Sequence, residues 1–189
     1  MNKYLTELTG TFFLVLVASF SGGNPFAVAA VLTAFLYIGG YISGAHYNPA
    51  VTFSVFLRGK ITGNEAIRYV AFQVVGSTGA AFVYQLIKGT PFLLSPALGV
   101  GIFQWGLIEV LFTGALCYTV LHVTVSKKNT PNQFFGIAIG LVLMAGLFAG
   151  APISGGVYNP AVILGAVLID FSHISSHIIN LMIYVTSQC

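Results

Sequence analysis

Charged residues are scarce in this sequence. Only 6% of its 189 residues are Asp, Glu, Lys or Arg and 57% are hydrophobic, whereas about a quarter of an ordinary soluble domain is charged. A normal soluble protein is therefore excluded. The formal net charge of +3 is too small and too scattered along the chain to indicate a nucleic-acid partner.

Residues that carry enzyme chemistry are also few. The two cysteines, Cys117 and Cys189, have neither metal-ligand nor redox spacing. The chain has no paired acids, no His, Cys and Asp spacing typical of a metal site, and no serine with a base to activate it. We therefore predict no enzyme activity, no cofactor and no metal. Of the four acids, Glu7 and Glu109 lie inside long apolar runs, where a charge is costly unless it faces a protein or water interior.

Apolar runs are abundant, and five are long enough to cross a bilayer as helices: 4–21, 26–42, 65–87, 101–125 and 133–150. A sixth candidate, 174–186, gives roughly 20 Å of helix and is short for a hydrocarbon core about 30 Å thick. The first run has no cleavage site, so it predicts a membrane span and not a cleaved signal. All seven prolines fall outside the interiors of the predicted spans.

The basic residues predict the orientation in the membrane. With the N terminus in the cytoplasm, six of them lie on the inner side and Lys88 alone lies outside. The inner six are Lys3, Arg58, Lys60, Arg68, Lys127 and Lys128. This bias follows the positive-inside rule.

Two shorter apolar segments, Tyr41 to Leu57 and Pro152 to Leu168, are copies of each other. Aligned without gaps, they share nine of seventeen residues, which indicates an internal duplication. Three predicted spans separate the copies, so the second enters the membrane from the opposite side. We predict a single domain with an inverted repeat, the first half covering about 1–88 and the second about 101–189.

Each copy contains Asn followed by Pro, typical of a helix that begins with a capping Asn and a proline in its first turn. We predict two re-entrant half-helices that meet N terminus to N terminus around an aqueous path. Their positive ends repel cations, and the amides of Asn48 and Asn159 donate to a passing oxygen. Glu7 and Glu109 are predicted to brace the loops by accepting hydrogen bonds from the backbone.

These segments resemble the aquaporin, or major intrinsic protein, family. SGAHYNPAV at 43–51 and SGGVYNPAV at 154–162 match the two family signatures, and ELTGTF at 7–12, IE at 108–109 and GIAIGLVL at 136–143 follow the family order. The resemblance implies an all-α, right-handed bundle of six transmembrane helices plus two half-helices. It also implies a pore in each protomer, a homotetramer, and pore motifs at Asn48, Pro49, Ala50, Asn159, Pro160 and Ala161.

The sequence departs from the family pattern at the selectivity filter. Most members have an arginine directly after the second Asn-Pro-Ala, and Val162 stands there instead. Family spacing places the other filter positions at Val28, Leu147 and Gly156. The resemblance therefore implies a wide, apolar constriction that admits glycerol, urea or ammonia as well as water, and that can also dewet and close.

Several alternatives stay open from the sequence. His46 either hydrogen-bonds within its loop or gates the pore by taking up a proton. A non-conducting or gated structural member, a secondary transporter and an ion channel are the rival functions. We expect a passive channel for water or small uncharged solutes in the cell membrane, with the lipid bilayer and further copies of the chain as partners.

Overall fold

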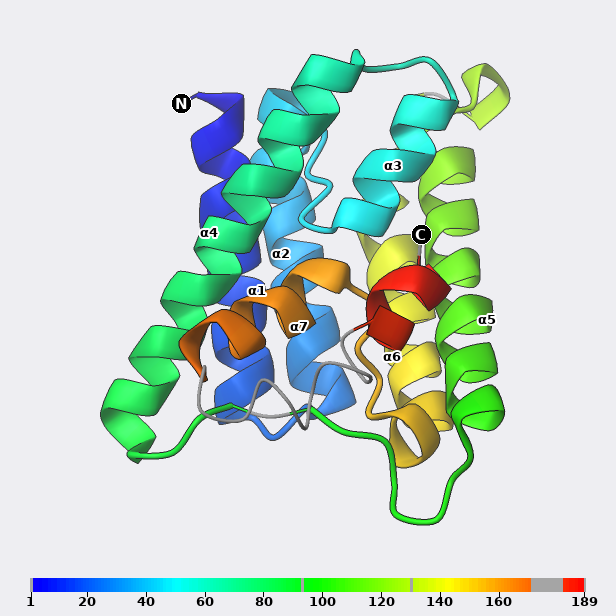
Figure 1. The fold of residues 1–189 in the computed structure, drawn as a ribbon. Helices are drawn as coiled ribbons and strands as arrows, with labels where there is room; N and C mark the ends of the chain where they lie inside the picture. Colours follow the sequence, from blue (N-terminus) through cyan, green and yellow to red (C-terminus); the bar gives the residue numbers. More distant parts are fainter. Residues whose placement is uncertain (1, 93, 130, 171–181, 189) are drawn as a thin grey trace.

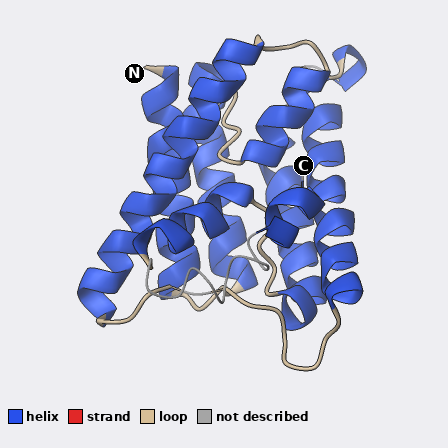
Figure 2. Cartoon of the chain, viewed as in Figure 1, coloured by secondary structure: helices blue, strands red, loops and turns tan. Residues whose placement is uncertain are grey.

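The computed structural model describes residues 2–92, 94–129, 131–170 and 182–188. These residues form helices and loops and no strand (Figure 2). Five helices are long and apolar enough to cross a membrane, close to the predicted spans: α1 (Lys3–Phe20), α2 (Pro25–Ser43), α4 (Gly63–Lys88), Ile102–Val125 and α6 (Phe135–Ser154). The sixth candidate span lies mostly outside the described residues, and its described end, within 182–188, is helical.

The span Ile102–Val125 has two parts. Helix α5 (Ile102–Val120) continues as a π-helical turn, η1 (Leu121–Val125), and a short 3-10 turn, η2 (Lys127–Asn129), follows. A π-turn widens the helix by one residue, and such turns occur frequently at functional sites. Val123, Thr124 and Val125 of this turn line a cavity at that end of the molecule.

Two short helices begin at the duplicated Asn-Pro pairs, as predicted. Helix α3 (Pro49–Leu57) has Asn48 as its N-cap, and helix α7 (Pro160–Ile169) has Asn159. Figure 1 shows α3 and α7 entering from opposite ends of the bundle, between the longer helices. Helix α7 packs on α4, α3 packs on α4 and α5, and the two short helices contact each other.

Helix α6 runs further than predicted. Pro152, expected to lie beyond the span 133–150, lies inside the last turn of α6, so the predicted end of this span was wrong. A proline there removes a single backbone N–H near the helix end, where the loss is small. Helix α6 ends at Gly155, whose φ of 89° is adopted easily only by glycine. Helix α2 ends in the same way at Gly44, with a φ of 85°.

Helices α1 and α4 approach closely at Gly76. A Cβ atom on Gly76 would lie 2.3 Å from the backbone oxygen of Leu8, whereas one on Gly79 would lie at an ordinary 3.5 Å from the ring of Phe12. Small residues allow such close contacts between membrane helices.

Replacing Gly76 with alanine is expected to lower the stability of the fold by about 1–3 kcal/mol, because backbone must move to admit the new methyl group. Thermal unfolding in detergent measures the effect. Gly79→Ala, the same change one turn further along α4, is the matched control and should unfold at or above the wild-type temperature. Equal unfolding temperatures for the two variants would contradict the close approach.

Candidate functional site

The N termini of α3 and α7 are joined by their capping asparagines. Asn48 Oδ1 accepts from the Ala50 N–H at 2.9 Å, and Asn159 Oδ1 accepts from the Ala161 N–H at 3.1 Å. Each amide nitrogen then donates to the opposite loop. Asn48 Nδ2 donates to the backbone oxygen of Tyr158 at 2.8 Å, and Asn159 Nδ2 donates to the backbone oxygen of Tyr47 at 2.9 Å. An amide nitrogen carries two hydrogens, so each asparagine keeps one donor for a passing solute.

Tyr47 and Tyr158, directly before the asparagines, hold the two loops in a sparsely populated conformation. Their φ angles are 50° and 45°, in the left-handed region that bulky residues rarely adopt. Their hydroxyls anchor them by donating to the backbone oxygens of Phe35 and Gly146, each at 3.0 Å. Such strain persists only where the surroundings over-determine it, and it clusters at functional sites.

Glu7 lies beneath the first loop and is fully buried. Its carboxylate accepts from the backbone N–H groups of His46 at 3.0 Å and Tyr47 at 2.7 Å. It also accepts from Ser43 Oγ at 2.6 Å and Gln73 Nε2 at 2.8 Å. Four donors therefore converge on one buried carboxylate, which satisfies its acceptor capacity away from water.

Glu109 has the equivalent place beneath the second loop. It accepts from the backbone N–H groups of Val157 at 3.1 Å and Tyr158 at 2.8 Å, and from Gln188 Nε2 at 2.6 Å. Both acids thus accept hydrogen bonds from the irregular backbone of the two loops, the contact that the sequence predicted for them.

Four supporting side chains were missed by the sequence reasoning: Tyr69, Gln73, Tyr184 and Gln188. The two glutamines donate to Glu7 and Glu109, and the two tyrosine hydroxyls donate to the backbone oxygens of Ser43 and Ser154. A signal was present, because Tyr-Val-x-x-Gln occurs at both 69–73 and 184–188. The duplication therefore extends into the helix after each half-helix.

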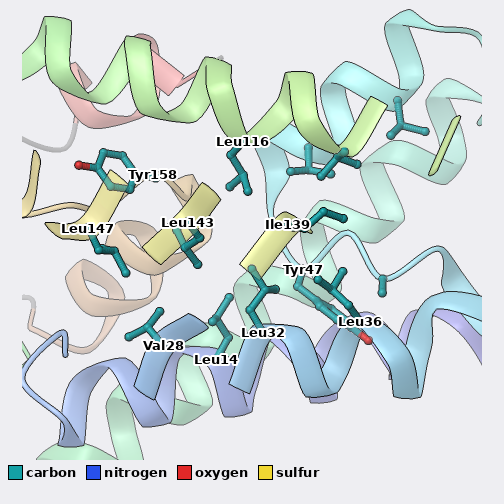
Figure 3. Packing of buried hydrophobic residues seen from close by; sticks show 14 residues of the cluster. Leu14, Val28, Leu32, Leu36, Tyr47, Leu116, Ile139, Leu143, Leu147 and Tyr158 are labelled. Carbon is teal, nitrogen blue, oxygen red and sulfur yellow. The ribbon is translucent and has the colours of Figure 1, made fainter. Parts of the chain in front are cut away.

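A cavity of about 470 Å³ lies beside the asparagines and contacts all four nominated filter residues, Val28, Leu147, Gly156 and Val162. Its wall is mostly apolar, and the buried hydrophobic residues labelled in Figure 3 come from several helices. Besides Leu147, the leucines and isoleucine that line it are Leu14, Leu32, Leu36, Leu94, Leu116, Ile139 and Leu143. Apart from backbone groups, the wall offers a solute few polar partners.

A second cavity of about 630 Å³ continues from the first toward Lys60 and Asn132. His46 and Val120 line both cavities, so the two meet there. His46 Nδ1 lies 3.2 Å from Thr52 Oγ1. Among the described residues that line the two cavities, Lys60 is the only one of the types Lys, Arg, Asp and Glu. Within the same described ranges, no group of three or more His, Cys, Asp or Glu side chains is arranged to hold a metal ion.

The sequence profile of the major intrinsic protein family matches residues 1–185. The chain belongs to that family. Among its aquaporin relatives, Aquaporin TIP1-1 of Arabidopsis thaliana is 32% identical over 91% of this chain and 77% of its own length. Probable aquaporin TIP-type alpha of Phaseolus vulgaris is 31% identical over 90% and 75%. The match to Aquaporin TIP2-1 of Arabidopsis thaliana is 39% identical over 66% of this chain and spans about half, 51%, of that protein's length.

The aquaporin fold is also found by structure. The X-ray structure of the aquaglyceroporin from Plasmodium falciparum superposes with a TM-score of 0.82, covering 98% of this chain and 88% of that one at 15% sequence identity. The predicted fold class is thereby confirmed. The family and the five apolar helices make the chain a multi-pass integral membrane protein.

Proposed function

We propose that this aquaporin-family chain is a passive membrane channel for water and small uncharged solutes, and not an enzyme. The observation that carries the proposal is the meeting of two capped half-helices beside a path formed by two cavities that share His46 and Val120. Asn48 and Asn159 line this path at the point where the half-helices meet.

The arrangement suits neutral solutes for electrostatic reasons. Each helix N terminus carries roughly half a positive charge, so two of them facing each other repel cations. The spare N–H of each asparagine amide attracts a solute oxygen and orients it. The apolar wall gives a proton no continuous chain of hydrogen bonds to follow.

The filter proposal rests on Val28, Leu147, Gly156 and Val162, which all contact one cavity. None of them has a polar side chain, so this stretch favours solutes that lose little on leaving water. We propose that glycerol, urea or ammonia passes here together with water. We also propose that Glu7 and Glu109 act as the braces that keep the loops in register around the path.

His46 is retained as a gating candidate. Its imidazole is buried at the junction of the two cavities and packs 5.1 Å from the ring of Tyr69. A positive charge acquired there would lie where the two cavities meet and would repel cations from the path.

Three further proposals come from the sequence and family. The chain is a single channel domain whose repeats cover about 1–88 and 101–189. It assembles as a homotetramer with one pore in each protomer. It lies in the cell membrane with its N terminus in the cytoplasm.

Introducing arginine at the filter tests the proposed function. In proteoliposomes, Val162→Arg is expected to reduce glycerol and urea permeability by about tenfold or more while retaining water permeability, because a guanidinium narrows and polarises the constriction. Val162→Met adds bulk without charge and is the matched control. Stopped-flow light scattering measures each solute against empty liposomes.

Either of two results would contradict this interpretation. If Val162→Arg changes water and glycerol permeability in equal proportion, Val162 does not act as a filter. If wild-type protein exceeds empty liposomes for none of the solutes, the channel proposal fails and the non-conducting alternative gains support.

A further inference from the structure

Tyr84 lines the first cavity at the end opposite the second cavity. It lies four residues before the end of α4 at Lys88, whereas the second cavity lies near Lys60 and Ile61, just before α4 begins. Solutes that leave the second cavity and pass the asparagines therefore meet Tyr84 near the far mouth. Neither the sequence signatures nor the nominated filter positions include this residue.

The ring of Tyr84 is held between two others. Phe20, the last residue of α1, lies 5.1 Å away at 61°, and Phe92 lies 5.6 Å away at 63°. Both arrangements are edge-to-face, the geometry that aromatic pairs prefer. The ring is therefore positioned by packing, and its orientation does not depend on the hydroxyl.

The hydroxyl of Tyr84 has a different environment from most other tyrosine hydroxyls. Five other tyrosines donate their hydroxyls to backbone oxygens of described residues, namely Tyr37, Tyr47, Tyr69, Tyr158 and Tyr184. No hydrogen bond joins the Tyr84 hydroxyl to another described residue. Tyr84 is half-buried, and a tyrosine hydroxyl in such a place normally has a hydrogen-bond partner. Because Tyr84 lines the cavity, a solute within the cavity can supply that partner.

The surrounding wall makes this hydroxyl distinctive. Val28, Leu147 and Val162 on the same cavity are apolar, and Ser19 Oγ already donates to the Leu16 oxygen at 2.9 Å. A solute with polar groups on one side and carbon on the other can contact the valines and still bind Tyr84.

We propose that Tyr84 is a specificity-determining residue of the outer cavity. Its hydroxyl binds one polar group of a small, uncharged organic solute with hydroxyl or amide groups on a carbon frame, while the apolar wall receives the carbon side. The inference rests on the proposed channel function and adds to it a residue and a solute class.

The test is Tyr84→Phe, which removes the hydroxyl and keeps the ring between Phe20 and Phe92. Glycerol and urea permeability in proteoliposomes is expected to fall about three- to tenfold, the effect of losing one neutral hydrogen bond, with water permeability unchanged. Tyr118→Phe is the matched control, because Tyr118 is exposed on α5 and lines neither cavity. It should leave every permeability at the wild-type level.

The outcomes separate this inference from the channel proposal. An unchanged ratio of glycerol to water permeability in Tyr84→Phe overturns the role of Tyr84, even if wild-type protein conducts both. A wild-type protein that conducts neither solute instead overturns the channel proposal on which the inference rests. Water permeability measured on the same vesicles shows that the variant has retained its fold.

Discussion

Replacing Glu7 with leucine is expected to destabilise the folded state severely, lowering both its unfolding temperature and the yield of folded protein. The change leaves four donors around the carboxylate without an acceptor, including the backbone N–H groups of His46 and Tyr47. Each buried donor left unsatisfied costs about 1–3 kcal/mol, so the combined loss is about 4 kcal/mol or more. Folded proteins are typically stable by only about 5–15 kcal/mol.

Glu65→Leu is the matched control for this prediction. Glu65 is also a glutamate on a membrane-spanning helix, but its side-chain partner is Lys3 near the surface, and ion pairs of that kind contribute little. Thermal unfolding in detergent and the yield of correctly folded protein measure both variants. Should Glu7→Leu unfold at the same temperature as Glu65→Leu, the first loop does not depend on the buried carboxylate.

Replacing Asn159 with leucine should reduce water permeability by about tenfold, the effect of losing one hydrogen bond to a passing oxygen. The change also removes the N-cap of α7 and the donor to the Tyr47 oxygen. Osmotic shrinkage of proteoliposomes, corrected for the amount of reconstituted protein, measures the loss.

The chain contains a control for the capping part of that effect. Asn24, followed by Pro25, caps α2 with the same Asn-Pro pattern, but its side chain is exposed and lines neither cavity. Asn24→Leu should therefore cost cap stability of about 0.5–2 kcal/mol and leave permeability per folded protein unchanged. If the two variants lose permeability equally, the loss comes from capping and the amide of Asn159 has no part in conduction.

Local signals in the sequence were sufficient for much of the fold. The Asn-Pro pairs predicted where α3 and α7 begin, because capping depends on neighbouring residues alone. Hydropathy predicted the five spans because it, too, depends only on residues that are close together in the sequence. Pro152 was misjudged because a proline is tolerated in the last turn of a helix, a distinction that composition does not carry.

Contacts between distant segments were harder to predict. Glu7 and Glu109 could be nominated because an acid in an apolar run needs partners. Gln73 and Gln188 could not, because a glutamine on a helix gives no sign of its target. The environment of Tyr84 depends on a contact between the end of α1 and the loop after α4. The periodicity of the sequence does not predict such a contact.

The reciprocal bonds between the two loops have a consequence for how the chain assembles. Asn48 requires the oxygen of Tyr158, which is made 110 residues later, and Asn159 requires the oxygen of Tyr47. These two bonds can therefore form only after both halves have been inserted, whereas the bonds to Glu7 join residues of the first half alone. A defect that displaces either loop is expected to break both reciprocal bonds at once.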